Sequence, residues 1–181
     1  HFCVLTLVLC PLLGRVSPKR FLRGMIPAFE VSFSTSSSVA TLPVTIECAS
    51  RRVGANENIC NFMLPVGATI NMDGTALYVT VASLFIAQVY GIHLGFQAQL
   101  MVFFTAVLVS VGTAGIPGAS IGLMSIILNA AGIPVEGIGM VIGVDRILDM
   151  SRTVVNITGD AVGAVVVSQS EGVMRSLTET R

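Results

Sequence analysis

Residues 145–160 read DRILDMSRTVVNITGD, and this stretch decides how the rest of the chain can fold. Apolar residues flank it on both sides, as in a membrane helix. Residues three or four apart share one face of a helix, which gives a single polar stripe of Asp149, Arg152, Asn156 and Asp160. One charge at mid-bilayer costs about 2.5–3.5 kcal/mol on insertion scales. The stripe must therefore face a wet cavity, its own members, or a bound ion and a charged ligand.

Two interpretations of this stripe are open. In the first, the side chains satisfy one another and form a purely structural network. In the second, they bind a cation and a charged ligand. Thr153 and Asn156 supply neutral oxygens beside the carboxylates, and such oxygens suit a cation site better than plain charge pairing does. We therefore favour a binding site.

The composition is that of a membrane protein. The mean hydropathy is +0.85, and charged residues make up 11% of the chain, against about 25% in soluble domains. From Gly74 to Val135 there is no Asp, Glu, Lys or Arg. That run is more than twice the roughly 20 residues that one crossing needs, so it must fold back within the membrane. We expect an all-α protein in the cell (plasma or inner) membrane, crossing it several times, with no nucleic-acid partner.

The first residues, 1–14, have the pattern of the end of a truncated transmembrane helix. The chain opens with His1 inside an apolar run and shows no signal peptide, so we expect a fragment of a longer protein. The cysteines have no spacing typical of metal or redox sites, and we expect free thiols at Cys3, Cys10, Cys48 and Cys60.

A first helical hairpin is expected at about 20–52. Basic residues flank it on both sides, at Arg15 to Arg23 and at Arg51-Arg52, and basic flanks mark the cytoplasmic side. Each leg is too short to cross a bilayer. We therefore expect a re-entrant hairpin with a serine-rich tip, whose hydroxyls can satisfy an unwound backbone. An amphipathic cytoplasmic loop is the alternative.

A broken spanning helix is expected at 57–90. The sequence NMDGT at 71–75 interrupts long apolar flanks, and glycine in a helix costs about 1 kcal/mol. Freed carbonyls at such a break can line a polar pocket, as in the discontinuous helices of secondary transporters. The structural alternative is that Asp73 pairs with an arginine elsewhere.

The second half of the chain repeats this order with opposite flanks. A hairpin at about 96–132 has no basic residue on either side and should enter from outside. The helix at 136–168 then returns to a cytoplasmic tail at 169–181. Residues 15–168 would form one domain, an inverted repeat in which a re-entrant hairpin plus a broken transmembrane helix occurs twice. Such repeats place a binding site near the membrane midplane.

Four motifs resemble those of the dicarboxylate/amino acid:cation symporter family, the glutamate and aspartate transporters. They are SSS at 36–38 with TLPVT at 41–45, GATINMDGTALY at 67–78, GTAGIPG at 112–118, and Asp149 with RTVVN at 152–156 and GD at 159–160. The resemblance covers nearly the whole chain and looks like the C-terminal transport half of that family.

The resemblance implies that Arg152 pairs with the side-chain carboxylate of an acidic amino acid and that Asp149 binds its amino group. A guanidinium fork suits a carboxylate, and an acid suits an ammonium group. The second tip, residues 112–118, would be the gate. The substrate would contact Ser36, Ser37, Met72, Thr75, Gly115, Ile116, Asp149, Arg152, Thr153 and Asn156.

The resemblance also implies coupling cations, Na⁺ or H⁺, and no other cofactor. Their sites would use Gly67, Thr69, Asn71, Asp73, Ser110, Val111, Thr113, Asn156 and Asp160. Family members are homotrimers in which this half moves past a fixed scaffold like an elevator. Val79 stands where animal glutamate carriers have a proton-carrying Glu, which argues against proton coupling through this position. Glu30 could be a proton site or a salt-bridge partner of Arg146, and neither residue has an assigned role.

Cation-coupled symport of acidic amino acids is thus the leading hypothesis. Symport of C4-dicarboxylates or neutral amino acids by the same family is the alternative. Arg152 argues against neutral substrates, and Asp149 argues against dicarboxylates, which have no ammonium group. An intramembrane aspartyl protease using Asp73 and Asp160 would need a Tyr-Asp motif that is absent, so no enzyme is expected. A fragment that does not transport by itself is the third hypothesis.

Overall fold

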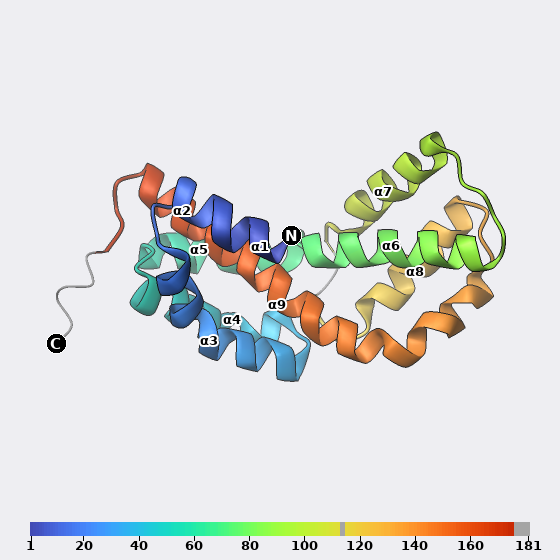
Figure 1. Ribbon diagram of the computed structural model, residues 1–181. Coiled ribbons are helices and arrows are strands. Elements are labelled where there is room, and N and C mark those ends of the chain that lie inside the picture. Colours follow the sequence, from blue (N-terminus) through green and yellow to red (C-terminus); the bar gives the residue numbers. More distant parts are fainter. Residues whose placement is uncertain (113–114, 176–181) are drawn as a thin grey trace.

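The computed structural model describes residues 1–112 and 115–175, and these residues are helical with no strand (Figure 1). The predicted all-α class is confirmed. The helices form an elongated molecule in which the long helix α9 (Ile138–Ser170) runs along most of the length. Shorter helices pack on both of its halves, so α9 is the common support of the fold.

The N-terminal stretch is helical and packs beside the C-terminal half of α9 (Figure 1). It comprises α1 (Phe2–Val4), the wider-turned η1 (Leu5–Leu9) and α2 (Cys10–Leu12). Cys10 is fully buried here, and all four cysteines are free thiols.

The first hairpin consists of α3 (Pro18–Thr35), α4 (Ser38–Glu47) and the wide turn η2 (Cys48–Val53). Serines set its ends. Ser17 caps α3 by accepting a hydrogen bond from the Arg20 backbone N–H at 3.4 Å, and Ser37 caps α4 by accepting from the Ala40 N–H at 3.1 Å. Between the legs, Ser36 adopts a left-handed conformation with φ +52°. Serine caps and one left-handed residue therefore reverse the chain in two residues.

The next two helices, α5 (Glu57–Ile70) and α6 (Asp73–Val89), are one element interrupted at Asn71 and Met72. Both residues leave the helical region, with ψ angles of 67° and 49°. Within the described part of the chain, the combined stretch Glu57–Val89 is the one helix long and apolar enough to cross a membrane. The interruption lies where α5 points its C-terminus toward the middle of α9.

The second hairpin consists of α7 (Phe96–Ser110) and α8 (Ala119–Ala130), followed by the short turn η3 (Val135–Gly137) and α9. The expectation of a second broken helix is wrong, because α9 is continuous over its 33 residues. The reason is chemical: α9 presents its polar groups through side chains such as Asp149 and Asn156. Its backbone can therefore keep every helical hydrogen bond.

Two apolar cores lie one after the other along α9. The first is built around Phe21, Met25, Leu64 and Ile157 and joins α3, η2 and α5 to the C-terminal half of α9. The second is built around Val79, Ile86, Met124 and Ile127 and joins α6, α7 and α8 to its N-terminal half. The stripe of charged residues on α9 lies between these cores, and the tips of both hairpins reach the same region.

Helix packing in the first core depends on Gly24 of α3. A Cβ atom there would lie 2.8 Å from the Val53 side chain and 3.4 Å from the Arg52 carbonyl carbon. We predict that Gly24→Ala lowers the free energy of unfolding by about 1–3 kcal/mol, the range for overpacking. Thermal unfolding followed by circular dichroism in detergent measures the change.

The matched control is Gly122→Ala in α8, where a Cβ atom meets nothing within 4 Å. Alanine is the better helix former by about 1 kcal/mol, so this variant should be as stable as the parent or more stable. Equal stability of both variants would contradict the close packing of α3 on η2.

Candidate functional site

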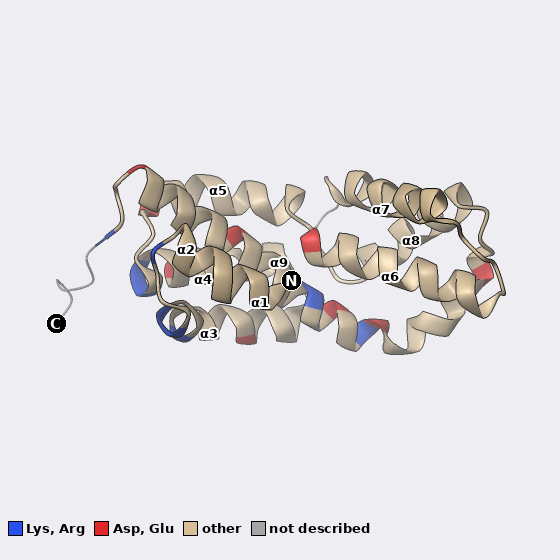
Figure 2. Ribbon diagram, turned by 45° about the horizontal axis from the view of Figure 1, so that its top comes forward, with Lys and Arg blue, Asp and Glu red and all other residues tan. Residues whose placement is uncertain are grey.

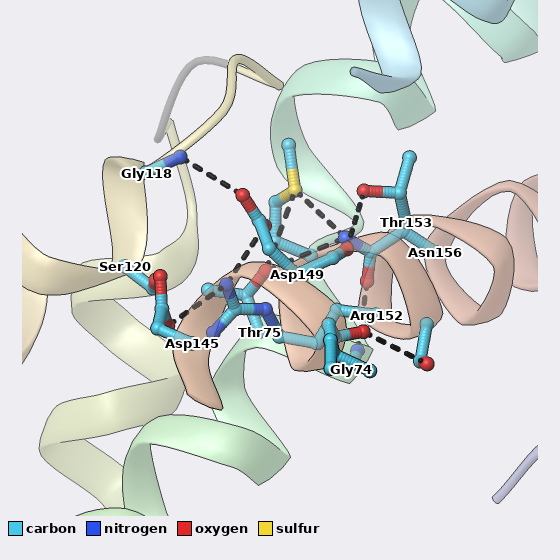
Figure 3. Close-up of polar contacts among 12 residues, drawn as sticks. Gly74, Thr75, Gly118, Ser120, Asp145, Asp149, Arg152, Thr153 and Asn156 are labelled. Carbon is cyan, nitrogen blue, oxygen red and sulfur yellow. Dashed lines mark hydrogen bonds and ion pairs between the residues drawn. The ribbon is translucent and has the colours of Figure 1, made fainter. Parts of the chain in front are cut away.

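The polar cluster between the two cores is built from the break in α5–α6, one stripe of α9 and the tips of both hairpins (Figure 3). Asp145, Asp149, Arg152 and Asn156 are all buried on α9, one helical turn apart or nearly so. Burying an isolated charge or an unpaired amide costs free energy, so each of these four side chains must have a polar partner.

Arg152 is the centre of the cluster. Its Nη2 donates to Asp149 at 2.7 Å and to Asp145 at 3.4 Å. The guanidinium carbon lies 4.0 Å from the centre of the Tyr78 ring on α6, which gives a cation–π contact. Two of its nitrogens, Nε and Nη1, are buried and have no hydrogen-bond partner among the described residues. The guanidinium is held firmly and still has two donors to offer.

Asp149 connects α9 to the second hairpin. While Oδ1 accepts from Arg152, Oδ2 accepts from the backbone N–H of Gly118 at 2.9 Å. Gly118 has φ +77° and directly precedes α8. One carboxylate therefore links the charged stripe to the tip of the α7–α8 hairpin (Figure 3).

The tips of the two hairpins meet. The Ser37 hydroxyl donates to the Gly115 carbonyl at 2.7 Å, and the Val39 N–H approaches the same oxygen at 3.5 Å. A Cβ atom on Gly115 would lie 2.9 Å from the Ala68 carbonyl oxygen, so only glycine fits this close approach. At the other side of the tip, the Gly112 N–H donates to the Thr69 carbonyl at 3.1 Å.

Asn156 hydrogen-bonds to residues at the break between α5 and α6. Its Oδ1 accepts from the Gly74 backbone N–H at 2.8 Å, one of the groups that the break leaves free at the start of α6. Its Nδ2 donates to Met72 Sδ at 3.2 Å and to Thr75 Oγ1 at 3.4 Å. Asn156 thus fixes the break against α9.

A small cavity of about 20 Å³ lies where these elements meet. Its volume is about that of one water site. The lining residues are Ser36, Ser38, Met72, Thr75, Gly115, Ile116, Ala119, Ser120, Asp149, Thr153 and Asn156. Eight of the ten substrate residues expected from the sequence line it. The other two, Ser37 and Arg152, hydrogen-bond directly to lining residues.

Sequence reasoning did not assign Ser38, Ala119, Ser120, Asp145 or Tyr78 to the site. Asp145 and Tyr78 matter most, because they hold the Arg152 guanidinium from two sides. A signal for Asp145 was present, since it lies one turn before Asp149 and two turns before Arg152 on the same stripe.

The oxygen atoms expected to bind cations lie on both sides of the break. On one side, Asn71 Nδ2 donates to Asp160 Oδ1 at 2.9 Å, and a Cβ atom on Gly67 would overlap the Asp160 carboxylate. An open groove of about 450 Å³ reaches these three residues from the apolar surface. The Asp160 carboxylate can therefore lie against α5 because position 67 has no side chain.

On the other side, Asp73, Ser110 and Val111 line a separate groove of about 320 Å³, which also contains His1 and Asn71. The His1 ring contacts the Asp73 carboxylate. Thr69 lies at the end of α5 next to this groove, and Thr113 lies outside the described residues. No group of three or more His, Cys, Asp or Glu side chains forms a metal cluster within residues 1–112 and 115–175.

Comparison with known proteins gives a family and close relatives. The family model described as "Sodium:dicarboxylate symporter family" matches residues 1–170. "Excitatory amino acid transporter" of Caenorhabditis elegans is 44% identical over 90% of this chain and 33% of its own length. "Excitatory amino acid transporter 3" of Mus musculus is 45% identical over 91% of this chain and 32% of its own length.

"Excitatory amino acid transporter 1" of Homo sapiens is 42% identical, over 92% of this chain and 31% of its own length. The chain therefore spans about a third of the length of the curated relatives that it matches.

The geometry predicts that Asp149 is the main stabilising partner of Arg152. Asp149→Asn keeps the shape but removes the charge, and breaking a buried ion pair leaves the other charge poorly compensated. We expect a loss of the order of 3 kcal/mol in the free energy of unfolding, measured by thermal unfolding in detergent.

Ser151→Ala on the same helix is the control, because Ser151 is exposed and bonds only to the Ile147 carbonyl of its own helix. It should change stability by no more than about 0.5 kcal/mol. If Asp149→Asn is as stable as this control, Asp145 and Tyr78 suffice to hold the guanidinium.

Proposed function

We propose that this chain binds an acidic amino acid together with Na⁺ and carries both across a membrane. The premise is that the chain belongs to the sodium:dicarboxylate symporter family. The family consists of transporters and not of enzymes, and its name states sodium coupling.

The observation that carries the proposal is the buried Arg152 with two free donors. Nε and Nη1 have no partner among the described residues, although the side chain is only 6% exposed. An unmade hydrogen bond from a buried charged group costs more than about 1–3 kcal/mol. A ligand carboxylate that reached either nitrogen would satisfy a buried donor with a charge-assisted hydrogen bond, which is stronger than a neutral one.

Asp149 supplies the complementary group. It lies on the cavity wall one turn from Arg152, and its acceptors suit the ammonium group of an amino acid. A C4-dicarboxylate would bring no positive charge to Asp149, and a neutral amino acid would leave the free donors of Arg152 unpaired. The pair of opposite charges therefore favours an acidic amino acid over both alternatives.

The charges around the site favour a coupling cation. Asp145, Asp149 and Asp160 are buried, Asp73 is partly buried, and Arg152 is the single buried basic side chain among the described residues. With these carboxyls ionised, bound cations would offset the excess negative charge, and the amide and carbonyl oxygens nearby are ligands for hard cations. We assign the first site to Gly67, Asn71, Asn156 and Asp160, and the second to the Thr69, Ser110, Val111 and Thr113 carbonyls.

A third site would use Asp73. Val79, the position of the proton-carrying Glu in animal glutamate carriers, is buried in the second apolar core. It offers no titratable group, so Na⁺ is the coupling ion that this chain supports best. Glu30 and Arg146 are exposed and form no ion pair within the described ranges, so we assign them no role in the site.

Entry of the substrate requires the α7–α8 tip to move. A cavity of about 20 Å³ holds about one water and is too small for an amino acid. The described residues of the tip hydrogen-bond to Ser37 through the Gly115 carbonyl, to Asp149 through the Gly118 N–H and to Thr69 through the Gly112 N–H. We therefore propose this tip as the gate, and its contact with Asp149 would couple gate closure to the substrate site.

In the membrane, we propose that the two hairpins are re-entrant and approach from opposite sides, so that their tips meet near the midplane. The halves α3–α6 and α7–α9 would be inverted repeats within one transport domain of a multi-pass protein. Such repeats rock or move against a fixed part of the transporter. Homotrimer formation and elevator-type movement are proposed for the whole protein, of which this chain covers one part.

The central test is Arg152→Ala. Truncating one partner of a buried charge pair costs about 2–5 kcal/mol, so we predict that kcat/KM for aspartate falls by at least about 30-fold. Uptake of alanine or serine should be retained or should appear, because the unpaired guanidinium no longer opposes it. Uptake of labelled amino acids into proteoliposomes measures both.

Arg146→Ala is the matched control, since Arg146 is an exposed arginine on the same helix with no ion pair to a described residue. It should transport aspartate normally. Parental aspartate uptake by Arg152→Ala would refute the role of the guanidinium. Succinate uptake that competes equally with aspartate would favour a dicarboxylate carrier.

Sodium coupling gives a separate prediction. Replacing Na⁺ by choline should abolish aspartate uptake. Gly67→Ala should raise the Na⁺ concentration for half-maximal uptake by about tenfold or more, the usual effect of disturbing a ligand's surroundings, because the new methyl group displaces the Asp160 carboxylate. Gly163→Ala is the control, with its Cβ atom in ordinary contact with Met63 at 3.6 Å. An unchanged Na⁺ dependence of Gly67→Ala would remove Asp160 from the cation site.

A further inference from the structure

One end of the molecule carries most of its Lys and Arg residues (Figure 2). We call this the basic collar. It consists of seven exposed side chains: Arg15, Lys19, Arg20, Arg23, Arg51, Arg52 and Arg175. The neighbouring acids are fewer, namely Glu47, Glu57 and Glu171. The collar therefore has a clear excess of positive charge.

Two hydrogen bonds to backbone carbonyls bring the three parts of the collar together. Arg20 Nη2 donates to the Val53 carbonyl at 2.6 Å, which joins the start of α3 to the end of η2. The Arg175 N–H donates to the Gly54 carbonyl at 2.8 Å, which brings the segment after α9 to the same place. The cations thus form one surface on a packed core and are not spread along a free tail.

The opposite end of the molecule has no comparable charge. Between Val53 and Asp145 the chain contains no Lys or Arg, and the turn between α8 and α9 carries Glu136. The connection from α6 to α7 likewise contains no Lys or Arg. The charge is therefore segregated along the length of the molecule.

Exposed apolar residues lie directly beside the collar. Leu12 and Leu13 are 70% and 50% exposed, and only Gly14 separates them from Arg15. Basic residues next to exposed apolar side chains are typical of segments that sit at a membrane–water interface. A soluble polyanion would leave the two leucines exposed to water, whereas a lipid surface provides both an apolar and an anionic layer.

We propose that the basic collar binds the phosphate headgroups of anionic phospholipids in the adjacent leaflet, with Leu12 and Leu13 in the acyl-chain region. The attraction amounts to about fivefold in affinity for each Lys or Arg near an anionic surface, and it decays within a Debye length. This inference requires only that the chain lies in a bilayer. It is independent of which substrate the protein carries.

The test uses the purified protein in nanodiscs of phosphatidylcholine with increasing amounts of phosphatidylglycerol. Native mass spectrometry counts the phosphatidylglycerol that the protein retains. Lys19→Gln should raise the lipid fraction needed for half occupancy by about fivefold. The triple variant Lys19→Gln, Arg23→Gln, Arg51→Gln, which removes three of the seven cations, should weaken the preference over phosphatidylcholine by about 100-fold, three such factors. None of these three side chains makes a described hydrogen bond or ion pair.

Two controls separate charge from folding. Lys19→Arg, Arg23→Lys, Arg51→Lys keeps the charge and should keep the lipid preference. Arg146→Gln removes an exposed cation outside the collar and should change nothing. Parental thermal unfolding of the Gln triple variant shows that it is folded. An unchanged preference in that variant, or an equal loss in Arg146→Gln, would overturn the proposal.

Salt and phosphate distinguish the source of the ligand. Raising the salt from 0.1 to 1 M shortens the Debye length from about 10 to about 3 Å, so the preference should weaken strongly. Inorganic phosphate at the concentration of the headgroups should not displace the lipid. Displacement would identify a site for free phosphate and would overturn the assignment to lipid.

Discussion

The burial of the Arg152 guanidinium between two apolar cores is the constraint on which the rest of the structure depends. A buried cation is tolerated only with nearby compensation, and here Asp149, Asp145 and the Tyr78 ring provide it. These partners come from two helices, so α6 must pack on α9 at this point. Since Nε and Nη1 stay unpartnered among the described residues, the compensation is incomplete. In the proposed function, a charged ligand supplies the missing hydrogen-bond partners.

The polar stripe on α9 also provides hydrogen-bond partners for backbone groups that the broken helix leaves unpaired. Interrupting α5–α6 frees peptide groups in an apolar setting, where each unmade hydrogen bond is costly. Asn156 satisfies the Gly74 N–H, and Asp149 satisfies the Gly118 N–H at the second tip. One helix thus provides the side chains that stabilise two irregular segments. Irregular backbone and polar side chains depend on each other, and neither would be stable in an apolar core alone.

Much of the helical fold was predictable, because long uncharged runs and Gly–Asn–Asp interruptions are strong local signals. The predicted interruption at residues 71–74 lies where α5 ends and α6 begins. The second predicted interruption was wrong, since a stripe of side chains on α9 needs no unwound backbone. Tyr78 and Asp145 were missed because their role is a three-dimensional contact with Arg152. Helical spacing indicates which residues share a face, but it does not indicate which neighbour stacks on them.

The contacts of α9 differ in kind from those of the tip between α7 and α8. α9 is continuous and belongs to both apolar cores, so the charges on it stay at fixed distances from one another. The described residues of the tip between α7 and α8 make hydrogen bonds to Ser37, Thr69 and Asp149. Each such bond contributes only about 0.5–1.5 kcal/mol, or somewhat more to a charged acceptor. In the proposed mechanism, the tip opens at a cost that a ligand bound at Asp149 and Arg152 offsets, while the charged stripe on α9 keeps its geometry.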